Sequence, residues 1–312
     1  MRCMNKFSFS KLVCILSAAC CLVAVIPSSA QTFDTLLSFD DSDGREPQLP
    51  PVQGVDGNLY GVTFAGGLNG VGTVYKITPE GVFSTLYNFC SLSGCTDGEA
   101  PLAGLVQGTD GNFYGTATQG GANGYGTVFK ITPSGKLKTL YSFGPYGYPE
   151  ATLVLATDGN FYGTTSSGGA NGYGTVFKIT PSGKLTTLHT FDGTDGAEIA
   201  AALVQDTNGN FYGTAPYGGA NNDGTVFSLS VGLGPFVETQ PTSGKVGSAV
   251  KILGTNLIGA TSVTFNGTAA VFKVVSASLI TTDVPTGATT GTVEVTTPKG
   301  TLKSNVAFRV TK

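Results

Sequence analysis

The sequence is poor in the side chains that most catalytic and metal sites use. It contains one histidine, His189, no tryptophan, and only 12% charged residues, which is about half the usual share. A catalytic triad needs a base and an orienting partner, and no such set stands out around His189. Glycine is abundant instead, with 46 residues, which is typical of a β protein rich in tight turns.

Long apolar runs are also scarce. Residues 12–26 are apolar, follow a basic segment and precede small residues that end at Ala30. The run is short for a membrane span, and the pattern predicts a secretory signal peptide over residues 1–30. Cys20 and Cys21 leave lipoprotein processing as an alternative, although the leucine expected three residues earlier is missing. We therefore expect a secreted, extracellular or cell-surface protein, or a periplasmic one.

Basic charge is low once this signal is removed. Three of the 17 basic residues lie in the first 30 positions, so 14 remain against 20 acidic ones, a net charge of −6. Nucleic acids and anionic membranes require a basic face. The composition therefore argues against nucleic-acid partners and against membrane insertion after signal removal.

Cysteine is almost absent from the mature chain. Four of the six cysteines lie in the signal, and only Cys90 and Cys95 remain. In an oxidising compartment this pair predicts a disulfide that closes a small loop. A metal or redox pair is the alternative, but no further cysteine and only one histidine are available. No cofactor is expected.

A seven-residue motif recurs four times. DGNFYGT starts at Asp110 and Asp158, NGNFYGT starts at Asn208, and a looser DGNLYGV starts at Asp56, so the repeat is about 50 residues long. Each repeat contains four extended segments separated by turn residues; in the second repeat they are 102–107, 112–118, 127–132 and 137–143. Four antiparallel strands in about 50 residues predict one β-propeller blade per repeat.

The order of the segments indicates how the ring closes. The fourth-strand pattern occurs at 32–39, 82–89, 136–143 and 184–191. The first copy precedes any blade, and the last repeat, which ends near Ser230, lacks one. We therefore predict a four-bladed β-propeller over residues 31–230, closed by its N-terminal strand so that no edge stays open. An open array, or two chains in a larger ring, is the alternative.

These repeats resemble the GloVer tandem repeat of secreted bacterial proteins. The matching pieces are DGNFYGT, GGANGYGTVFKI and TPSGKLTTL. The resemblance implies an extracellular location and a propeller-like fold, and it brings no established activity.

The repeat stops at a linker, residues 231–235, and a different pattern follows over 236–312. Its short alternating segments are 249–253, 262–265, 270–275, 279–284, 292–296 and 306–310. They predict an immunoglobulin-like β-sandwich. The pieces PTSG, ILGTN, VTFNG and VPTG resemble the IPT/TIG domain, which usually acts as a spacer or adhesion module in bacterial surface proteins. Its basic residues are scattered, so the DNA-binding use of some relatives is not expected here.

Two sets of residues are candidates for binding. The first is one glutamate before the first strand of each blade: Glu46, Glu99, Glu150 and Glu198. First strands line a propeller channel, so four carboxylates could ring one mouth, attract a cation and raise each other's pKa values. Exposed polar rim residues are the alternative.

The second set lies in loops, where the copies differ. Val71, Tyr125, Tyr173 and Asp223 occupy matching positions in otherwise similar loops. Loops on a rigid scaffold often bind ligands. The candidate ligand-binding residues are Tyr125, Tyr173, Asp223, Tyr146, Tyr148 and Tyr217, with the tyrosines stacking on sugar rings. Tyrosines that cap the blade edges are the alternative.

The remaining polar residues favour structural roles. Asp56, Asp110 and Asp158 precede glycine in turns, where the side chain bonds its own backbone, and Asn208 does this equally well. His189 stands where two sister repeats have tyrosine, which favours packing.

Three functions follow from these patterns. The first is a secreted, non-enzymatic binding or adhesion protein that recognises polysaccharide or an extracellular protein. The second is a polysaccharide-active propeller enzyme with paired carboxylates; near-identical blades disfavour it because catalysis needs unlike groups in one pocket. The third is a purely structural envelope component.

Overall fold

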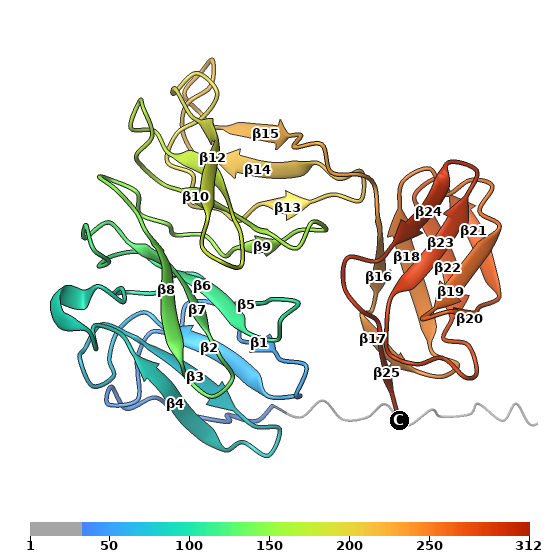
Figure 1. Cartoon of the computed structure of the whole chain (residues 1–312), viewed down its shortest axis with the longest axis horizontal. Helices are drawn as coiled ribbons and strands as arrows, with labels where there is room; N and C mark the ends of the chain where they lie inside the picture. Colours follow the sequence, from blue (N-terminus) through green and yellow to red (C-terminus); the bar gives the residue numbers. More distant parts are fainter. Residues whose placement is uncertain (1–32) are drawn as a thin grey trace, which may run out of the picture. The chain divides into compact units, whose positions relative to one another are not determined.

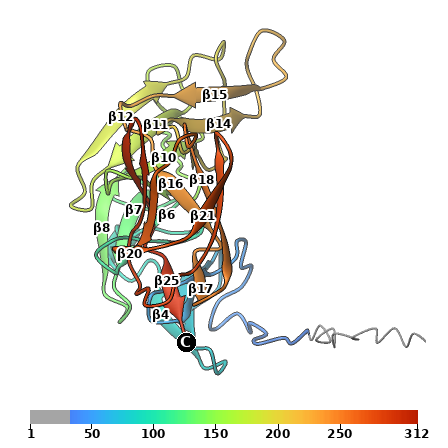
Figure 2. The same cartoon turned by 90° about the vertical axis from the view of Figure 1, so that its right-hand side faces the viewer.

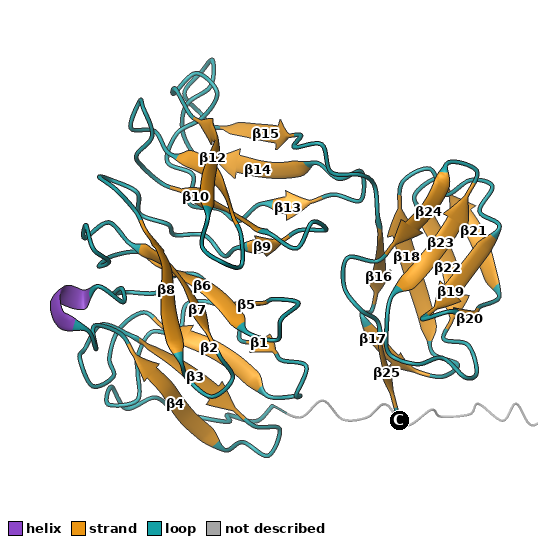
Figure 3. Ribbon diagram, viewed as in Figure 1, coloured by secondary structure: helices purple, strands orange, loops and turns teal. Residues whose placement is uncertain are grey.

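The computed structural model describes residues 33–312, and the predicted signal peptide lies outside the described residues. The described chain is all-β apart from one short 3-10 helix, η1 (Ser93–Cys95), as Figure 3 shows. Cys90 and Cys95 are joined by a disulfide beside this turn. None of the described residues forms a helix long and apolar enough to cross a membrane.

Each of the first three repeats forms one four-stranded antiparallel sheet, and neighbouring strands in the chain are neighbours in the sheet (Figure 1). The fourth repeat forms a three-stranded sheet. The strands are β1 (Val52–Gln53), β2 (Leu59–Thr63), β3 (Thr73–Ile77) and β4 (Phe83–Asn88); β5 (Val106–Gln107), β6 (Phe113–Ala117), β7 (Thr127–Ile131) and β8 (Leu137–Ser142); β9 (Val154–Leu155), β10 (Phe161–Thr165), β11 (Thr175–Ile179) and β12 (Leu185–Thr190); and β13 (Val204–Gln205), β14 (Phe211–Ala215) and β15 (Thr225–Leu229).

The DGN turn sets the register of each sheet. In the second repeat, Gly111 has a φ of 77°, which L side chains rarely adopt, and its N–H donates to the carbonyl of Gly108. The turn places Phe113 opposite Gln107 and, across the sheet, opposite Ile131. The first strand is shorter than predicted, because only its last two residues pair in the sheet.

The second strands form the centre of the repeat region. All five residues of β6 and of β10 are buried, since neighbouring repeats cover both faces. Gly115 in β6 is required there: a Cβ would lie 2.7 Å from the ring of Phe129 and 2.9 Å from Leu105. The heptapeptide is therefore a building part of the fold.

The predicted closing strand at 32–39 is not observed. No residue from 33 to 40 is in a strand, and among the described residues β15 has no fourth strand beside it. The ring of Phe39 instead packs edge-on against Tyr75 and Phe83 of the first repeat. A strand forms only where a partner lies about 4.8 Å away to accept its hydrogen bonds, and this segment has no such partner within residues 33–312.

The C-terminal region contains two four-stranded antiparallel sheets and one parallel pair. One sheet has the order β16-β18-β22-β21, the other β20-β19-β23-β24, and β17 pairs with β25. The bounds are β16 (Val237–Gln240), β17 (Ser243–Lys245), β18 (Ala249–Gly254), β19 (Ser262–Phe265), β20 (Thr268–Ala269), β21 (Phe272–Ser276), β22 (Leu279–Asp283), β23 (Val293–Thr297), β24 (Gly300–Lys303) and β25 (Arg309–Thr311).

Both of these sheets contribute to one hydrophobic core. Ile252 and Ile280 of the first sheet and Phe265 and Val295 of the second are buried in the same cluster. Figure 2 shows β18 and β21 in a view turned by 90°. All six predicted segments are strands, with shifts of one to three residues at most ends.

Candidate functional site

The repeated aspartates serve the turns. Asp110 accepts hydrogen bonds from the Tyr114 hydroxyl at 2.9 Å and from the Asn112 side chain at 2.7 Å, and Lys130 Nζ lies 3.4 Å away. Asp56 and Asp158 accept equivalent bonds from the tyrosine and the asparagine of their own repeats. Their lone pairs are used inside the repeat, which explains why the sequence keeps them.

These contacts shift the pKa values of both the aspartate and the tyrosine. Burial alone would raise the pKa of Asp110, but the bonds from Asn112, Tyr114 and Lys130 outweigh it and lower that pKa below the ordinary value. Burial, together with the bond to Asp56, raises the pKa of Tyr60 to about 12. The paired form, with a charged carboxylate and a neutral phenol, is therefore the stable one at neutral pH.

The four candidate glutamates are not equivalent in the structure. Glu46 and Glu198 share a left-handed φ of 57°, and Ala100 and Tyr148 adopt the matching conformation in the other repeats. Glu46 is exposed with its carboxylate 3.8 Å from Arg45, whereas Glu150 accepts a bond from Ser166 at 3.0 Å.

The structure does not gather these glutamates into a metal site. Within residues 33–312, no group of three or more His, Cys, Asp or Glu side chains is placed to hold a metal ion. Each glutamate meets different neighbours because the four do not occupy the same place before the first strand: Glu46 and Glu198 lie six residues before it, Glu99 seven and Glu150 four.

Three of the candidate tyrosines form one cluster. The ring of Tyr125 lies 5.4 Å from that of Tyr146 and 5.6 Å from that of Tyr148, between centroids. The Tyr148 N–H also donates to the Tyr125 carbonyl at 3.0 Å. Tyr146 is 61% exposed, so its ring presents an open face to solvent while Tyr125 supports it.

The other loop candidates are not part of this cluster. Tyr173 and Tyr217 are exposed, and Asp223 is exposed at the end of the chain of repeats. Tyr173 faces a glycine, Gly193, in the loop that follows the third repeat. No contact joins these residues to the tyrosine cluster among the described aromatic pairs.

The tyrosine cluster lies where one repeat junction departs from the others. In two other junctions an aspartate organises the loop: Asp97 accepts the Tyr87 hydroxyl at 2.7 Å, and Asp195 bonds His189 at 2.7 Å. His189 therefore occupies the place of a tyrosine and makes the same bond. The loop at 144–148, GPYGY, contains no aspartate and supplies Tyr146 and Tyr148 instead.

A cavity of about 390 Å³ lies at the same junction. Gly144, Pro145 and Gly147 line one side of it, and hydroxyl side chains such as Ser167 and Thr187 line the other. The cluster and the cavity thus share one loop. The sequence identified the tyrosines by their divergence, but the cavity depends on packing between two repeats.

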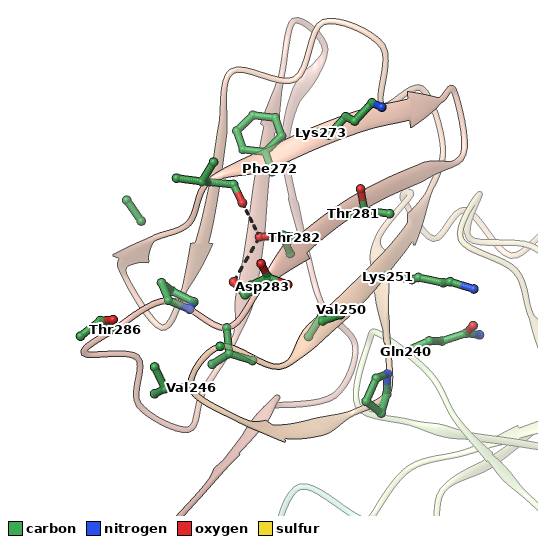
Figure 4. Close-up of a pocket in the computed structure, with 17 residues that line it drawn as sticks. Gln240, Val246, Val250, Lys251, Phe272, Lys273, Thr281, Thr282, Asp283 and Thr286 are labelled. Atoms are coloured by element: carbon green, nitrogen blue, oxygen red, sulfur yellow. Dashed lines mark hydrogen bonds between the residues drawn. The ribbon is translucent and has the colours of Figure 1, made fainter. Parts of the chain in front are cut away.

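A larger hollow of about 900 Å³ lies on the C-terminal region, and no residue there was singled out from the sequence (Figure 4). Thr282 is central to it. Its Oγ1 lies 2.7 Å from the Val271 carbonyl and 3.3 Å from that of Asp283, so its proton is donated within the protein. Lys251 and Lys273 lie at its edge and are exposed. Val271, which is exposed in the structure, lay inside the predicted strand 270–275 and gave no signal in the sequence.

Comparison with known families identifies both regions. A model of the Gloeobacter/Verrucomicrobia repeat matches residues 22–227 and 92–272. The chain belongs to the Gloeobacter/Verrucomicrobia repeat family. Within this repeat protein, residues 236–310 match the IPT/TIG domain. Both resemblances noted in the sequence are thereby confirmed. No curated protein matches the chain.

Several solved structures share weak similarity with this repeat protein. A gluconolactonase from Xanthomonas campestris has 12% identity and a TM-score of 0.39, covering 84% of this chain and 86% of its own. A periplasmic gluconolactonase from Pseudomonas aeruginosa has 14% identity and a TM-score of 0.34, covering 82% and 85%. A fungal alcohol oxidase in complex with copper has 14% identity and a TM-score of 0.29, covering 83% and 74%. At such TM-scores these similarities assign no activity to the chain.

Proposed function

We infer that this protein is a secreted or cell-surface, non-enzymatic binding protein whose tyrosine cluster recognises polysaccharide. The observation that supports this is the packing of the half-buried Tyr125 and Tyr148 with the exposed Tyr146 at the junction where the repeats differ. In this proposal the repeats are blades of a β-propeller, and the IPT/TIG domain is an immunoglobulin-like spacer.

The cluster has the chemistry that sugar binding requires. A tyrosine ring presents an apolar face that stacks on the C–H face of a pyranose, and its hydroxyl bonds the sugar hydroxyls. Tyr146 is open to solvent, and its ring packs on Tyr125, which also contacts Tyr148. Such support reduces the entropy lost when a ligand binds.

The neighbouring cavity suits a neutral, hydroxyl-rich ligand. Its lining includes the hydroxyls of Ser167, Thr187 and Thr190 and backbone from the 144–147 segment. Neutral hydroxyls donate and accept hydrogen bonds, as sugar hydroxyls do. No acidic or basic side chain is among the lining residues, so a charged ligand would find no counter-ion there.

The test is a glycan-array screen of residues 31–312 beside two single variants. Tyr146→Ala removes the exposed ring of the cluster, and Tyr217→Ala removes an exposed tyrosine outside it. We expect binding to weaken about tenfold in the first variant, equivalent to about 1.4 kcal/mol, and to remain unchanged in the second.

Each other outcome contradicts part of the proposal. Equal binding by both variants would place the site elsewhere, and no binding to any glycan would exclude polysaccharide as the ligand. The glycans that bind in the screen are also incubated with the protein in solution, and their chain lengths are measured afterwards. Shortened products would show an enzyme with paired carboxylates instead.

A further inference from the structure

We propose that the exposed end of the fourth repeat binds the first repeat of a second copy of this chain. The end in question is the face of β14 and β15 that contains Tyr212 and Val226. Val226 is 80% exposed, although its counterparts Val74, Val128 and Val176 are fully buried. An apolar face that is core in three repeats is thus open in the fourth.

Each internal junction shows what such a face binds. The repeat tyrosine stacks on the second-strand phenylalanine of the next repeat: Tyr60 on Phe113, Tyr114 on Phe161, and Tyr162 on Phe211. Tyr212 has the same position in the last repeat but is 36% exposed. The counterpart of these phenylalanines in the first repeat is Leu59, an apolar side chain of similar reach.

A glutamine makes a polar contact between repeats, and in the first repeat this glutamine lacks its partner. Gln107 donates to the Gly111 carbonyl, and its Oε1 accepts the N–H of Val55 in the preceding repeat at 2.9 Å. Gln53 makes the same donation, to Gly57 at 3.2 Å. Among residues 33–312, no donor is bonded to Oε1 of Gln53. By repeat position, the matching donor is the N–H of Thr207.

Backbone hydrogen bonds in the loops also join each repeat to the preceding one. The N–H groups of Ala100, Tyr148 and Glu198 donate to carbonyls in the preceding repeat, on Val71, Tyr125 and Tyr173. Their counterparts at the two ends are the N–H of Glu46 and the carbonyl of Asp223. In the described part of the chain neither is hydrogen bonded, so the two ends are complementary in this contact too.

The N-terminal segment can also supply the missing fourth strand. Phe39 packs on Tyr75 as Phe89 packs on Phe129, Phe143 on Phe177, and Phe191 on Phe227. Phe89, Phe143 and Phe191 directly follow the fourth strands β4, β8 and β12. Phe39 is the last residue of the matching sequence pattern at 32–39. Phe39 is therefore already in register for a strand that belongs to the preceding repeat.

The known register predicts which residues would pair. Val176 lies opposite His189, and Thr175 lies opposite Thr190. Shifted by repeat position, Val226 would lie opposite Leu37 and Thr225 opposite Ser38. This pairing would protect the open edge of β15.

A second copy is the occupant that the structure favours. Within one chain, Phe39 already packs on the first repeat while Val226 stays exposed, so the two complementary ends do not meet. Two copies joined head to tail at both ends satisfy all of these contacts twice. The resulting ring has twice the four repeat sheets of one chain, the upper end of the usual propeller range of about 4 to 8 blades.

Cysteine cross-linking tests this contact. Leu37→Cys and Val226→Cys are made in separate chains of residues 31–312, then mixed and oxidised. We expect a disulfide-linked pair in the mixture, absent when either variant is oxidised with wild type. A double variant whose two cysteines join within one chain would overturn the proposal, because it would show that each chain closes its own ring.

The mass in solution provides a second measurement. Light scattering is expected to give twice the mass of one chain for the wild type and the mass of one chain for Val226→Asp. Val271→Asp, which changes an exposed valine in the IPT/TIG domain, is the matched control and should keep the double mass. Circular dichroism confirms that both variants are folded. A wild-type mass of one chain, without cross-linking, would refute the proposed contact.

Discussion

The ring of Tyr114 is stacked on the ring of Phe161 in the next repeat, with 4.0 Å between centroids. Both side chains are fully buried, and the Tyr114 hydroxyl donates to Asp110 in its own turn. One side chain thus joins the turn of its own repeat to the core of the next. Stacked aromatic pairs add about 0.5–1.5 kcal/mol beyond the burial of their area. Buried aromatic contacts therefore join the repeats, in addition to the hydrogen bonds between them.

Removing one of these rings should weaken the whole repeat region. Phe161→Ala is expected to lower the free energy of unfolding by about 3–5 kcal/mol, because it deletes a large buried ring and leaves a cavity. Urea unfolding followed by fluorescence measures the change. The control, Val271→Ala at an exposed position, should change it by less than about 0.5 kcal/mol. A loss below about 1 kcal/mol in Phe161→Ala would contradict close packing at this junction.

The turn aspartates should make stability depend on acid pH. The folded-state pKa of Asp110 is lowered, so its contribution is complete above the ordinary aspartate pKa of about 3.9 and is lost as the pH falls through the folded value. Asp110→Asn copies Asn208, which bonds its own tyrosine at 3.1 Å, and is expected to cost about 1 kcal/mol at pH 7.

The pH profile separates this effect from a general loss of packing. The difference in unfolding free energy between wild type and Asp110→Asn should shrink below about pH 4, since only the wild type loses a charge there. Asp110→Ala should cost more than Asp110→Asn at neutral pH because it leaves the buried Tyr114 hydroxyl without a partner. A constant difference from pH 7 to pH 3 would disprove the role assigned to the carboxylate.

His189 should be replaceable by tyrosine. Its Nε2 lies 2.7 Å from Asp195, and Tyr87 makes a bond of the same length to Asp97 in the first repeat. His189→Tyr is therefore expected to keep the melting temperature within a few degrees. His189→Phe, which has a ring but no polar atom, should lose about 1 kcal/mol because Asp195 loses its bond to the ring and keeps only the N–H of Asp192. Equal losses in both variants would show that this bond does not hold the loop.

Local sequence patterns determined most of the secondary structure. Asp-Gly-Asn turns and alternating β-branched and aromatic residues predicted β6, β7 and β8 to within two residues, because turn chemistry and the period of a strand act over short distances. The first strands were overestimated. Residues 102–105 are apolar because Leu105 and its neighbours pack against other repeats, and not because they pair in a sheet.

The candidate sites were predicted less completely. Divergence between copies identified Tyr125, Tyr146 and Tyr148, but their sequence positions do not reveal that these three meet while Tyr173 and Tyr217 stand apart. The four glutamates looked equivalent in the sequence. The structure separates them because only Glu46 and Glu198 occupy the left-handed position, which Ala100 and Tyr148 occupy in the other two repeats.

The sequence by itself determined the four repeats, their turns, the buried tyrosines and phenylalanines, and the IPT/TIG strands, because each depends on residues a few positions apart. Only the tertiary structure decided which rings stack across junctions, where the cavity forms, and that Phe39 packs on the first repeat while Val226 remains open. Those outcomes depend on contacts between segments far apart in the chain, and a repeated sequence offers several equivalent partners for each contact.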